Sequence, residues 1–216
     1  MSDPRLADDV LLDLAAVRGS LTVAIDPDAL RNPLPAAHLW ARTGGSRGVA
    51  RRMRLDLACV RDRAVNMFLA QHARGGARWR TGIWGATGLI PLLWYSSWGL
   101  PADRWFSKAP PRTLGLESHF RWSVRVLALA GRLAGVRMPS PEYVPVSAPA
   151  AIVRWMAGVL AAGETPHLWG APSSAVRLCE AAEAAGADLA GARFTITGEP
   201  VTAARLAVIG RVRGEA

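Results

Sequence analysis

Apolar residues recur every three to four positions over residues 5–18, and Gly19 follows the last of them. This spacing predicts a helix over residues 5–18. Residues 21–25 form a short β-like run, and residues 52–55 alternate between polar and apolar side chains as a strand does. The first quarter of the chain is therefore expected to contain a helix and short strands.

A longer apolar face predicts the next helix, from about Leu57 to His72, with Asp56 as its N-cap and the pair Gly75-Gly76 at its end. Residues 81–102 then contain no charged side chain, and this length is enough to span a bilayer. Glycines, prolines and dispersed tryptophans instead favour a buried strand over residues 79–86 followed by an apolar loop or helix. The membrane interpretation stays open as an alternative.

The middle of the chain is expected to contain two helices and a strand. Residues 117–135 have the apolar spacing of an amphipathic helix, which fits a domain helix with arginines on its solvent side or, alternatively, attachment to a membrane surface. Residues 143–147 are typical of a short strand. Pro149 marks the start of a helix over residues 150–162.

The last third alternates between strands and helices. We expect strands at residues 167–169 and 194–197, each followed by a helix, at residues 172–185 and 202–212. Strands joined through helices by short links form a parallel sheet, so the predicted fold class is α/β with a parallel-rich sheet and flanking helices. Ligands of such sheets bind beyond the carboxyl ends of the strands. The turns expected at those ends are residues 170–174 and 198–200.

Composition narrows the class of protein. Half of the 216 residues are apolar and a fifth are charged, which is typical of a globular chain. The net charge is +9, but Lys108 is the only lysine and 25 of the 26 basic residues are Arg, which together with abundant Ala indicates the coding bias of a GC-rich genome. No arginine–aromatic pattern that reads DNA or RNA is recognisable, so we expect no nucleic-acid partner.

The cysteines and the first residues bear on the cellular compartment. Cys59 and Cys179 form no C-x-x-C motif, and each lies in an apolar helical pattern, which predicts two reduced core thiols. Residues 1–5 carry no signal-peptide pattern. We expect a cytoplasmic protein.

One loop has the composition of a phosphate-binding site. Residues 43–52 contain three glycines, two hydroxyl side chains and three arginines. Glycine lets a ligand approach the main chain, and exposed N–H groups with Ser, Thr and Arg side chains form a cradle for phosphate. The segment lacks the Walker pattern, and a solvated turn is the alternative interpretation.

The order of residues in this loop resembles the phosphate loop of adenylate-forming enzymes (the acyl-CoA synthetase, luciferase and peptide-synthetase adenylation superfamily), written (S/T)-S-G-(S/T)-T-G-x-P-K. Gly44, Arg47 and Ala50 depart from the pattern, and Arg51 replaces its lysine with another cation. The resemblance implies that the β- and γ-phosphates of ATP are held by Thr43, Gly45, Ser46, Gly48 and Arg51.

A second resemblance to the same family lies near the end of the sequence. Residues 196–202 are similar to the turn that packs on adenine, which implies that the base is flanked by Gly198, Glu199 and Pro200. The residues similar to an acyl-pocket turn of phenylacetate–CoA ligase-like proteins are Trp169, Gly170, Ala171 and Pro172. Ordinary βα turns are the alternative. His167 has no partner at a recognisable spacing, so we expect a strand-edge residue rather than a general base.

The resemblance covers about residues 40–216 and fails at two places. The family's Y-G-x-T-E motif, whose Glu helps to hold Mg²⁺, is absent because neither Tyr95 nor Tyr143 begins one. Lys108 does not lie where the catalytic lysine of the family's C-terminal domain would lie. We therefore expect residues 1–216 to be a single incomplete N-terminal domain, with residues 1–39 as a leader region and the C-terminal domain absent.

The resemblance implies an AMP-forming ligase. A carboxylic acid would attack Mg²⁺-bound ATP to give an acyl-adenylate and pyrophosphate, and a thiol such as CoA would then displace AMP. The expected partners are a small carboxylic acid, a nucleotide and a protein that supplies the missing half. The missing half makes activity of the chain alone doubtful. Two alternatives stay open: a non-catalytic remnant or subunit that binds a protein partner, and a membrane-associated protein through residues 81–102.

Overall fold

The computed structural model describes eleven stretches and single positions of the chain: residues 10–16, 19–25, 39–42, 52–55, 57–85, 89–108, 129, 131, 133, 135–136 and 138–212. Residues 1–62 and residues 63–216 form two compact units. The following paragraphs take each unit by itself.

The described part of the first unit contains two antiparallel strand pairs. β1 (Val10–Ala16) pairs with β2 (Gly19–Ile25), with Ala16 opposite Gly19, and β3 (Leu39–Arg42) pairs with β4 (Arg52–Leu55). The strands expected at residues 21–25 and 52–55 are confirmed. The helix expected over residues 5–18 is wrong, because positions 10, 12, 14 and 16 are all apolar and this period of two, once β2 is available as a partner, is satisfied by a strand.

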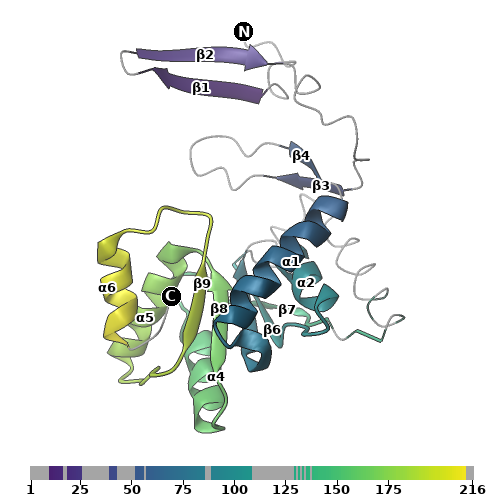
Figure 1. Ribbon diagram of the computed structural model, residues 1–216. Helices are drawn as coiled ribbons and strands as arrows, with labels where there is room; N and C mark the ends of the chain where they lie inside the picture. The colour runs from purple at the N-terminus through teal and green to yellow at the C-terminus, as the bar shows by residue number, and fades with distance from the viewer. Residues whose placement is uncertain are drawn as a thin grey trace. The chain divides into compact units, whose positions relative to one another are not determined.

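The second unit is an α/β fold around a five-stranded, all-parallel sheet (Figure 1). Its spatial order is β7-β6-β5-β8-β9, so the chain starts at the centre, adds strands on one side and then returns to add strands on the other. The strands are β5 (Arg80–Gly85), β6 (Arg104–Ser107), β7 (Pro141–Tyr143), β8 (Pro166–Gly170) and β9 (Arg193–Ile196).

Five helices flank this sheet. They are α1 (Leu57–Ala73), α2 (Leu89–Ser97), α4 (Ala150–Ala161), α5 (Pro172–Ala184) and α6 (Ala203–Arg211), and a short 3-10 helix, η3 (Gly76–Arg78), follows α1. The helices predicted to start near residues 57, 150, 172 and 202 are confirmed. Gly75 has φ +80°, in the left-handed region that glycine tolerates, which explains why α1 ends before it.

The sheet separates two apolar cores, because side chains alternate between its faces. On one face Trp84, Phe106, Leu168 and Phe194 pack against α4, α5 and α6. On the other face Ile83 and Trp105 pack against Leu92 and Tyr95 of α2. The Tyr95 hydroxyl donates to Oε1 of Gln71 on α1 at 2.8 Å, which places α1 on the same face as α2. Helices on both faces explain why four successive residues of the central strand β5, residues 81–84, are all buried.

Three details differ from the expectations. The strand expected at residues 143–147 lies earlier, at Pro141–Tyr143. Val144 N still donates to Ser107 O at 2.8 Å, but Pro145 has no N–H with which to continue the ladder. Cys179 is buried as expected, but Cys59 is exposed, since it precedes the buried Val60 by one position and therefore points about 100° away from it around α1. Most of residues 117–135 lie outside the described residues.

The uncharged segment 81–102 is divided between secondary-structure elements. Its first residues belong to the central strand β5, and its middle forms the nine-residue helix α2. Within the described ranges no helix is both long enough and apolar enough to cross a membrane.

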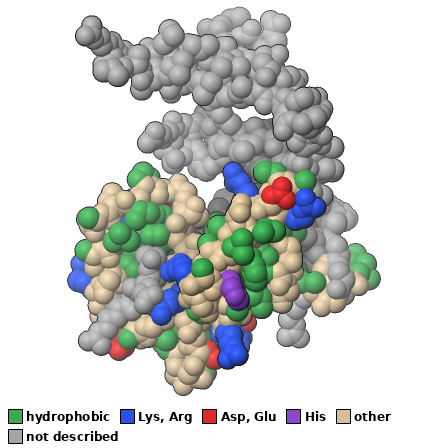
Figure 2. Space-filling model, viewed as in Figure 1, with side chains coloured by type: hydrophobic (Ala, Val, Ile, Leu, Met, Phe, Trp, Pro, Cys, Tyr) green, Lys and Arg blue, Asp and Glu red, His purple; other side chains and the backbone are tan. Residues whose placement is uncertain are grey.

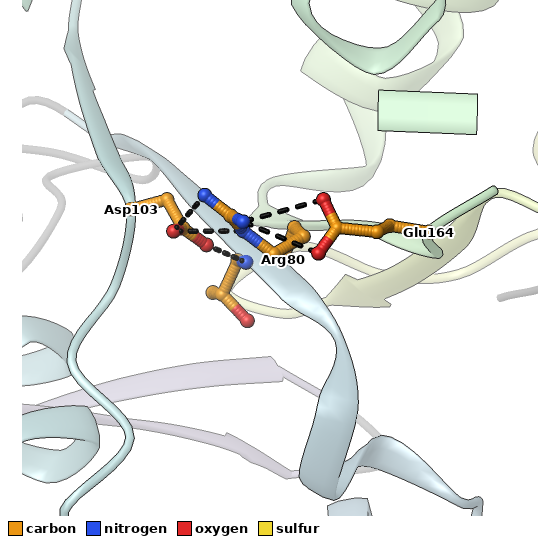
Figure 3. A network of polar contacts seen from close by, with 4 residues as sticks. Arg80, Asp103 and Glu164 are labelled. Atoms are coloured by element: carbon orange, nitrogen blue, oxygen red, sulfur yellow. Dashed lines mark hydrogen bonds and ion pairs between the residues drawn. The ribbon is translucent and has the colours of Figure 1, made fainter. Parts of the chain in front are cut away.

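An ion-pair network fastens the amino edge of the sheet. Figure 3 shows Arg80, the first residue of β5, between Asp103 and Glu164. Its Nε donates to Asp103 Oδ1 at 2.9 Å, and its Nη1 lies 3.2 Å from Glu164 Oε2. Asp103 Oδ2 also accepts from Thr81 N at 2.9 Å. Because Asp103 precedes β6 and Glu164 precedes β8, one guanidinium joins the starts of three adjacent strands.

Candidate functional site

The carboxyl edge of the sheet, opposite this network, carries the candidate site. From β5 the chain first adds β6 and β7 on one side of the sheet and then β8 and β9 on the other. The gap between β5 and β8 is therefore the topological switch point, and open α/β sheets bind ligands at such a point. The main chains are close here, since a Cβ built on Gly170 would lie 3.2 Å from the carbonyl oxygen of Trp84. The turns after β8 and β9 are two of the segments singled out from the sequence.

A single carboxylate joins those two turns. Glu199, after β9, accepts from Ser173 Oγ at 2.7 Å and from Ser173 N at 3.1 Å, and Ser173 lies in the first turn of α5. The helix dipole favours a negative charge at this end of α5. Arg205 Nη1 lies 3.2 Å from Glu199 Oε2 and donates to Pro200 O at 2.7 Å, which holds the turn from the side of α6. Segments 170–174 and 198–200 are therefore in contact.

A lysine reaches the same place from a third strand. Lys108 follows β6, and its N–H donates to Gly85 O at the end of β5. Its ammonium lies 5.5 Å from the centre of the Trp84 ring, and its Nζ donates to Ser174 Oγ on α5. Since β5 lies between β6 and β8, the side chain of Lys108 crosses the end of the central strand to reach the helix that follows β8.

Burial and charge set the titration of this cluster. Burial lowers the pKa of Lys108, and the negative charge of Glu199 opposes part of that shift. Burial alone would raise the pKa of Glu199, but hydrogen bonds from Ser173 and the positive charges of Arg205 and Lys108 outweigh it and lower that pKa. The carboxylate is therefore ionised at neutral pH, and it faces two cations.

The opposite face of the sheet carries the other candidate, Trp169. Its ring packs edge-on to Trp94 of α2, with ring centres 6.4 Å apart. The indole N–H groups of Trp94, Trp98 and Trp169 are buried and have no hydrogen-bond acceptor in the described part of the chain. The structure thus places Trp169 in the core shared with α2, whereas Lys108 lies over Trp84 on the face of α4, α5 and α6.

His167 is fully buried in β8, an interior strand, so the expectation of a strand-edge residue is wrong. Its Nε2 lies 2.8 Å from Thr195 Oγ1 and its Nδ1 lies 3.2 Å from Thr81 Oγ1, so both ring nitrogens have partners on neighbouring strands. Burial, with a smaller contribution from the charge of Arg74, lowers the pKa of His167 to about 3. The ring is neutral and joins β5, β8 and β9 from within.

The remaining sequence-predicted residues divide into two groups. Gly198 has φ +86°, which only glycine adopts easily, so the 198–200 turn requires it. The phosphate-loop residues Thr43, Gly45, Ser46, Gly48 and Arg51 lie outside the described residues.

The sequence did not predict Lys108 and Arg205 as members of the site, and it placed Ser173 and Ser174 in the 170–174 turn without giving them a role. The available signal was a lone lysine two residues after the apolar pair Trp105-Phe106, together with hydroxyls at the start of a helix that follows a strand.

Among the described residues no group of three or more His, Cys, Asp or Glu side chains is placed to hold a metal ion. Comparison of the sequence with protein-family models and with curated proteins finds no match.

Proposed function

We propose that this chain is a relative of AMP-forming carboxylate-activating ligases and binds ATP and a carboxylic acid at the carboxyl edge of the sheet. The resemblance to adenylate-forming enzymes supplies the reaction: the acid attacks the α-phosphorus of ATP, pyrophosphate leaves, and a thiol such as CoA displaces AMP from the acyl-adenylate. In this proposal Mg²⁺ arrives with the nucleotide phosphates, and no residue of the chain is assigned to it.

The observation that supports the proposal is the contact between Glu199 and Ser173. The resemblance assigns residues 169–172 to the acyl pocket and residues 198–200 to adenine, about 30 residues apart in the sequence, and a shared site requires them to be neighbours. Ser173, the residue that follows the first segment, donates two hydrogen bonds to the Glu199 carboxylate and so brings the two segments together beside the switch point.

The residues of this edge have separate roles in the proposal. The main chain of the Gly198-Glu199-Pro200 turn presents a flat polar edge to a purine, and Arg205 with Ser173 keeps that turn in place. In the proposal Trp169 contacts the acyl group from the α2 face of the sheet, as the resemblance implies, and its buried indole N–H has no acceptor among the described residues. Binding aligns the carboxylate with the α-phosphorus, and alignment and charge neutralisation are the main sources of rate in such transfers.

The test is calorimetric titration of the full 216-residue chain with MgATP, followed by carboxylate-dependent exchange of pyrophosphate into ATP. We expect binding by the wild-type chain and affinity reduced at least about tenfold in Glu199→Ala, which releases the turn. The resemblance assigns Arg51 to the ATP phosphates, and Arg51→Ala tests that assignment by itself. The matched control is Glu180→Ala, which removes an exposed carboxylate from the outer face of α5 and should bind as the wild type does.

Failure to bind MgATP by a folded chain would contradict the proposal. It would favour the second candidate, a non-catalytic subunit that binds a protein partner. The observation behind that candidate is the pair Val65 and Leu69, one turn apart on α1 and 52% and 57% exposed. Hydrophobic side chains gather over α1 on the face seen in Figure 2.

A further inference from the structure

A lysine at the end of a buried strand, such as Lys108, lowers the stability of the fold unless its charge is compensated. Its side chain is half-buried over Trp84, and an ammonium group loses hydration when it is buried. The contact with the Trp84 ring and the hydrogen bond to Ser174 offset only part of that cost. The position rather than the packing is distinctive, because the ammonium crosses the end of β5 at the switch point.

Two side chains there, Lys108 and Ser174, carry more N–H and O–H groups than they have acceptors for among the described residues. An ammonium group has three N–H donors, and in the described part of the chain Ser174 Oγ is the acceptor that Lys108 meets. The Ser174 hydroxyl, which is 1% exposed, accepts that bond and so keeps its own proton to donate. Donors without acceptors in the described ranges, on a half-buried cation and on a buried hydroxyl, point to an acceptor that carries negative charge.

The nearby carboxylate does not fill this role. Both oxygens of Glu199 are engaged, Oε1 by Ser173 Oγ and Oε2 by Ser173 N and Arg205. Glu199 therefore acts on Lys108 through its charge at a distance and not through a direct hydrogen bond. An oxyanion placed beside Lys108 and Ser174 would accept hydrogen bonds from both side chains.

We propose that Lys108 and Ser174 bind an oxyanion of the substrate at the switch point, through the Lys108 ammonium and the Ser174 hydroxyl, while Glu199 and Arg205 hold the adjoining turn. The shared chemistry is a carboxylate or phosphate oxygen. The assignment of that oxygen to the carboxylic acid or to ATP rests on the proposed function; the anion-binding pair itself rests on the contacts of Lys108 and Ser174. Lys108 and Ser174 are then substrate-binding residues of this edge.

The experiment uses the full chain and its single lysine. Labelling with [ε-¹³C]lysine gives one side-chain signal, from Lys108, which reports directly on the site. The probes are MgATP, inorganic pyrophosphate and benzoate, each added separately, with affinity measured in parallel by calorimetry. The variants are Lys108→Met, which keeps an apolar stem over Trp84, and Ser174→Ala. Arg177→Met is the matched control, since it removes a positive charge from the exposed face of the same helix.

The expected result is a change in the chemical shift of Lys108 on addition of one probe. The affinity for that probe should fall at least about tenfold in Lys108→Met and in Ser174→Ala and stay unchanged in Arg177→Met. A shift with MgATP or pyrophosphate identifies a phosphate oxygen, and a shift with benzoate identifies a carboxylate. Should a variant fail to fold, the signal of the wild-type chain decides alone.

The outcomes separate this inference from the proposed function. If MgATP binds but none of the three probes changes the chemical shift of Lys108, the proposed anion site is wrong and the ligase proposal stands. A Lys108 shift with pyrophosphate or benzoate in a chain that does not bind MgATP supports the anion pair and removes the ligase proposal. No binding and no shift with any probe overturns both.

Discussion

The charge of Glu199 partly opposes the effect of burial on the pKa of Lys108, and this coupling is measurable. Burial lowers the pKa of Lys108, while the Glu199 carboxylate raises it in part. We expect Glu199→Gln to lower the pKa of Lys108 further, because the substitution removes the negative charge and retains an oxygen that Ser173 can donate to. Titration of the [ε-¹³C]lysine signal between pH 7 and 11 measures both values.

The control for this coupling is Glu180→Gln on the exposed face of α5, which should leave the titration of Lys108 where it is in the wild type. A pKa that stays constant or rises in Glu199→Gln would contradict the coupling. The result also bears on the ligand, since a bound oxyanion would restore the negative charge that the variant lacks and raise the pKa of Lys108 again.

At the scale of single residues, the sequence predicted positions better than contacts. Glu199 and Gly170 were placed at strand ends because a strand followed by a helix has a defined direction. The contact of Lys108 with Ser174 was not predictable in the same way. It depends on β6 lying next to β5 and β5 next to β8, and this order is set by the crossovers and not by the spacing of apolar residues.

At the scale of elements, Arg80 holds the amino edge of the sheet together, and we expect it to affect stability but not ligand binding. We expect Arg80→Met to lower the free energy of unfolding by about 1–2 kcal/mol. Arg80 pairs with both Asp103 and Glu164, and the substitution leaves the partly buried Asp103 without its cation. The loss is small because water screens this pair: the side chains of Arg80 and Glu164 are 44% and 45% exposed. Urea denaturation measures the change.

Arg104→Met is the matched comparison for this clamp. Arg104 lies in β6 and pairs with one carboxylate, Glu142, at 3.1 Å, and both side chains are exposed. Its loss should cost about 0.5 kcal/mol or less. Equal losses of unfolding free energy in the two variants would contradict the role of Arg80 in linking the starts of three strands. Binding of MgATP should stay at the wild-type level in both, because this edge is opposite the candidate site.

The elements also show where sequence patterns carry enough information. Residues 166–212 were predicted nearly to the residue, since long helices with clear starts alternate there with apolar strands. Residues 10–16 were mispredicted because their apolar positions satisfy both the helical and the alternating period, and only the partner strand β2 decides between them. The strands β6 and β7 show no such alternation, because Trp105 and Phe106 are adjacent apolar residues and β7 is only three residues long.

At the scale of the whole molecule, the buried His167 should make folding sensitive to mild acid. The pKa of His167 is about 3 in the folded chain, because of its burial, against an ordinary value of about 6.5. The unfolded chain therefore binds a proton at this ring as the pH falls below about 6.5, while the folded chain binds none until about pH 3. Stability is lost over that window, with a slope of at most about 1.4 kcal/mol per pH unit.

The range between pH 6.5 and 5 isolates this effect, because the lowered pKa values of Glu183 and Glu199 affect stability only at lower pH. Over this range we expect the wild-type chain to lose about 1–2 kcal/mol more than His167→Gln, which retains polar atoms toward Thr81 and Thr195 but does not titrate. Denaturation followed by far-ultraviolet circular dichroism at several pH values measures both slopes. Because His167 joins β5, β8 and β9 from within the sheet, its protonation opposes the strand arrangement on which the whole carboxyl edge depends. Parallel slopes in the two chains would contradict this, and would mean that the acid sensitivity of the fold comes from groups other than the central histidine.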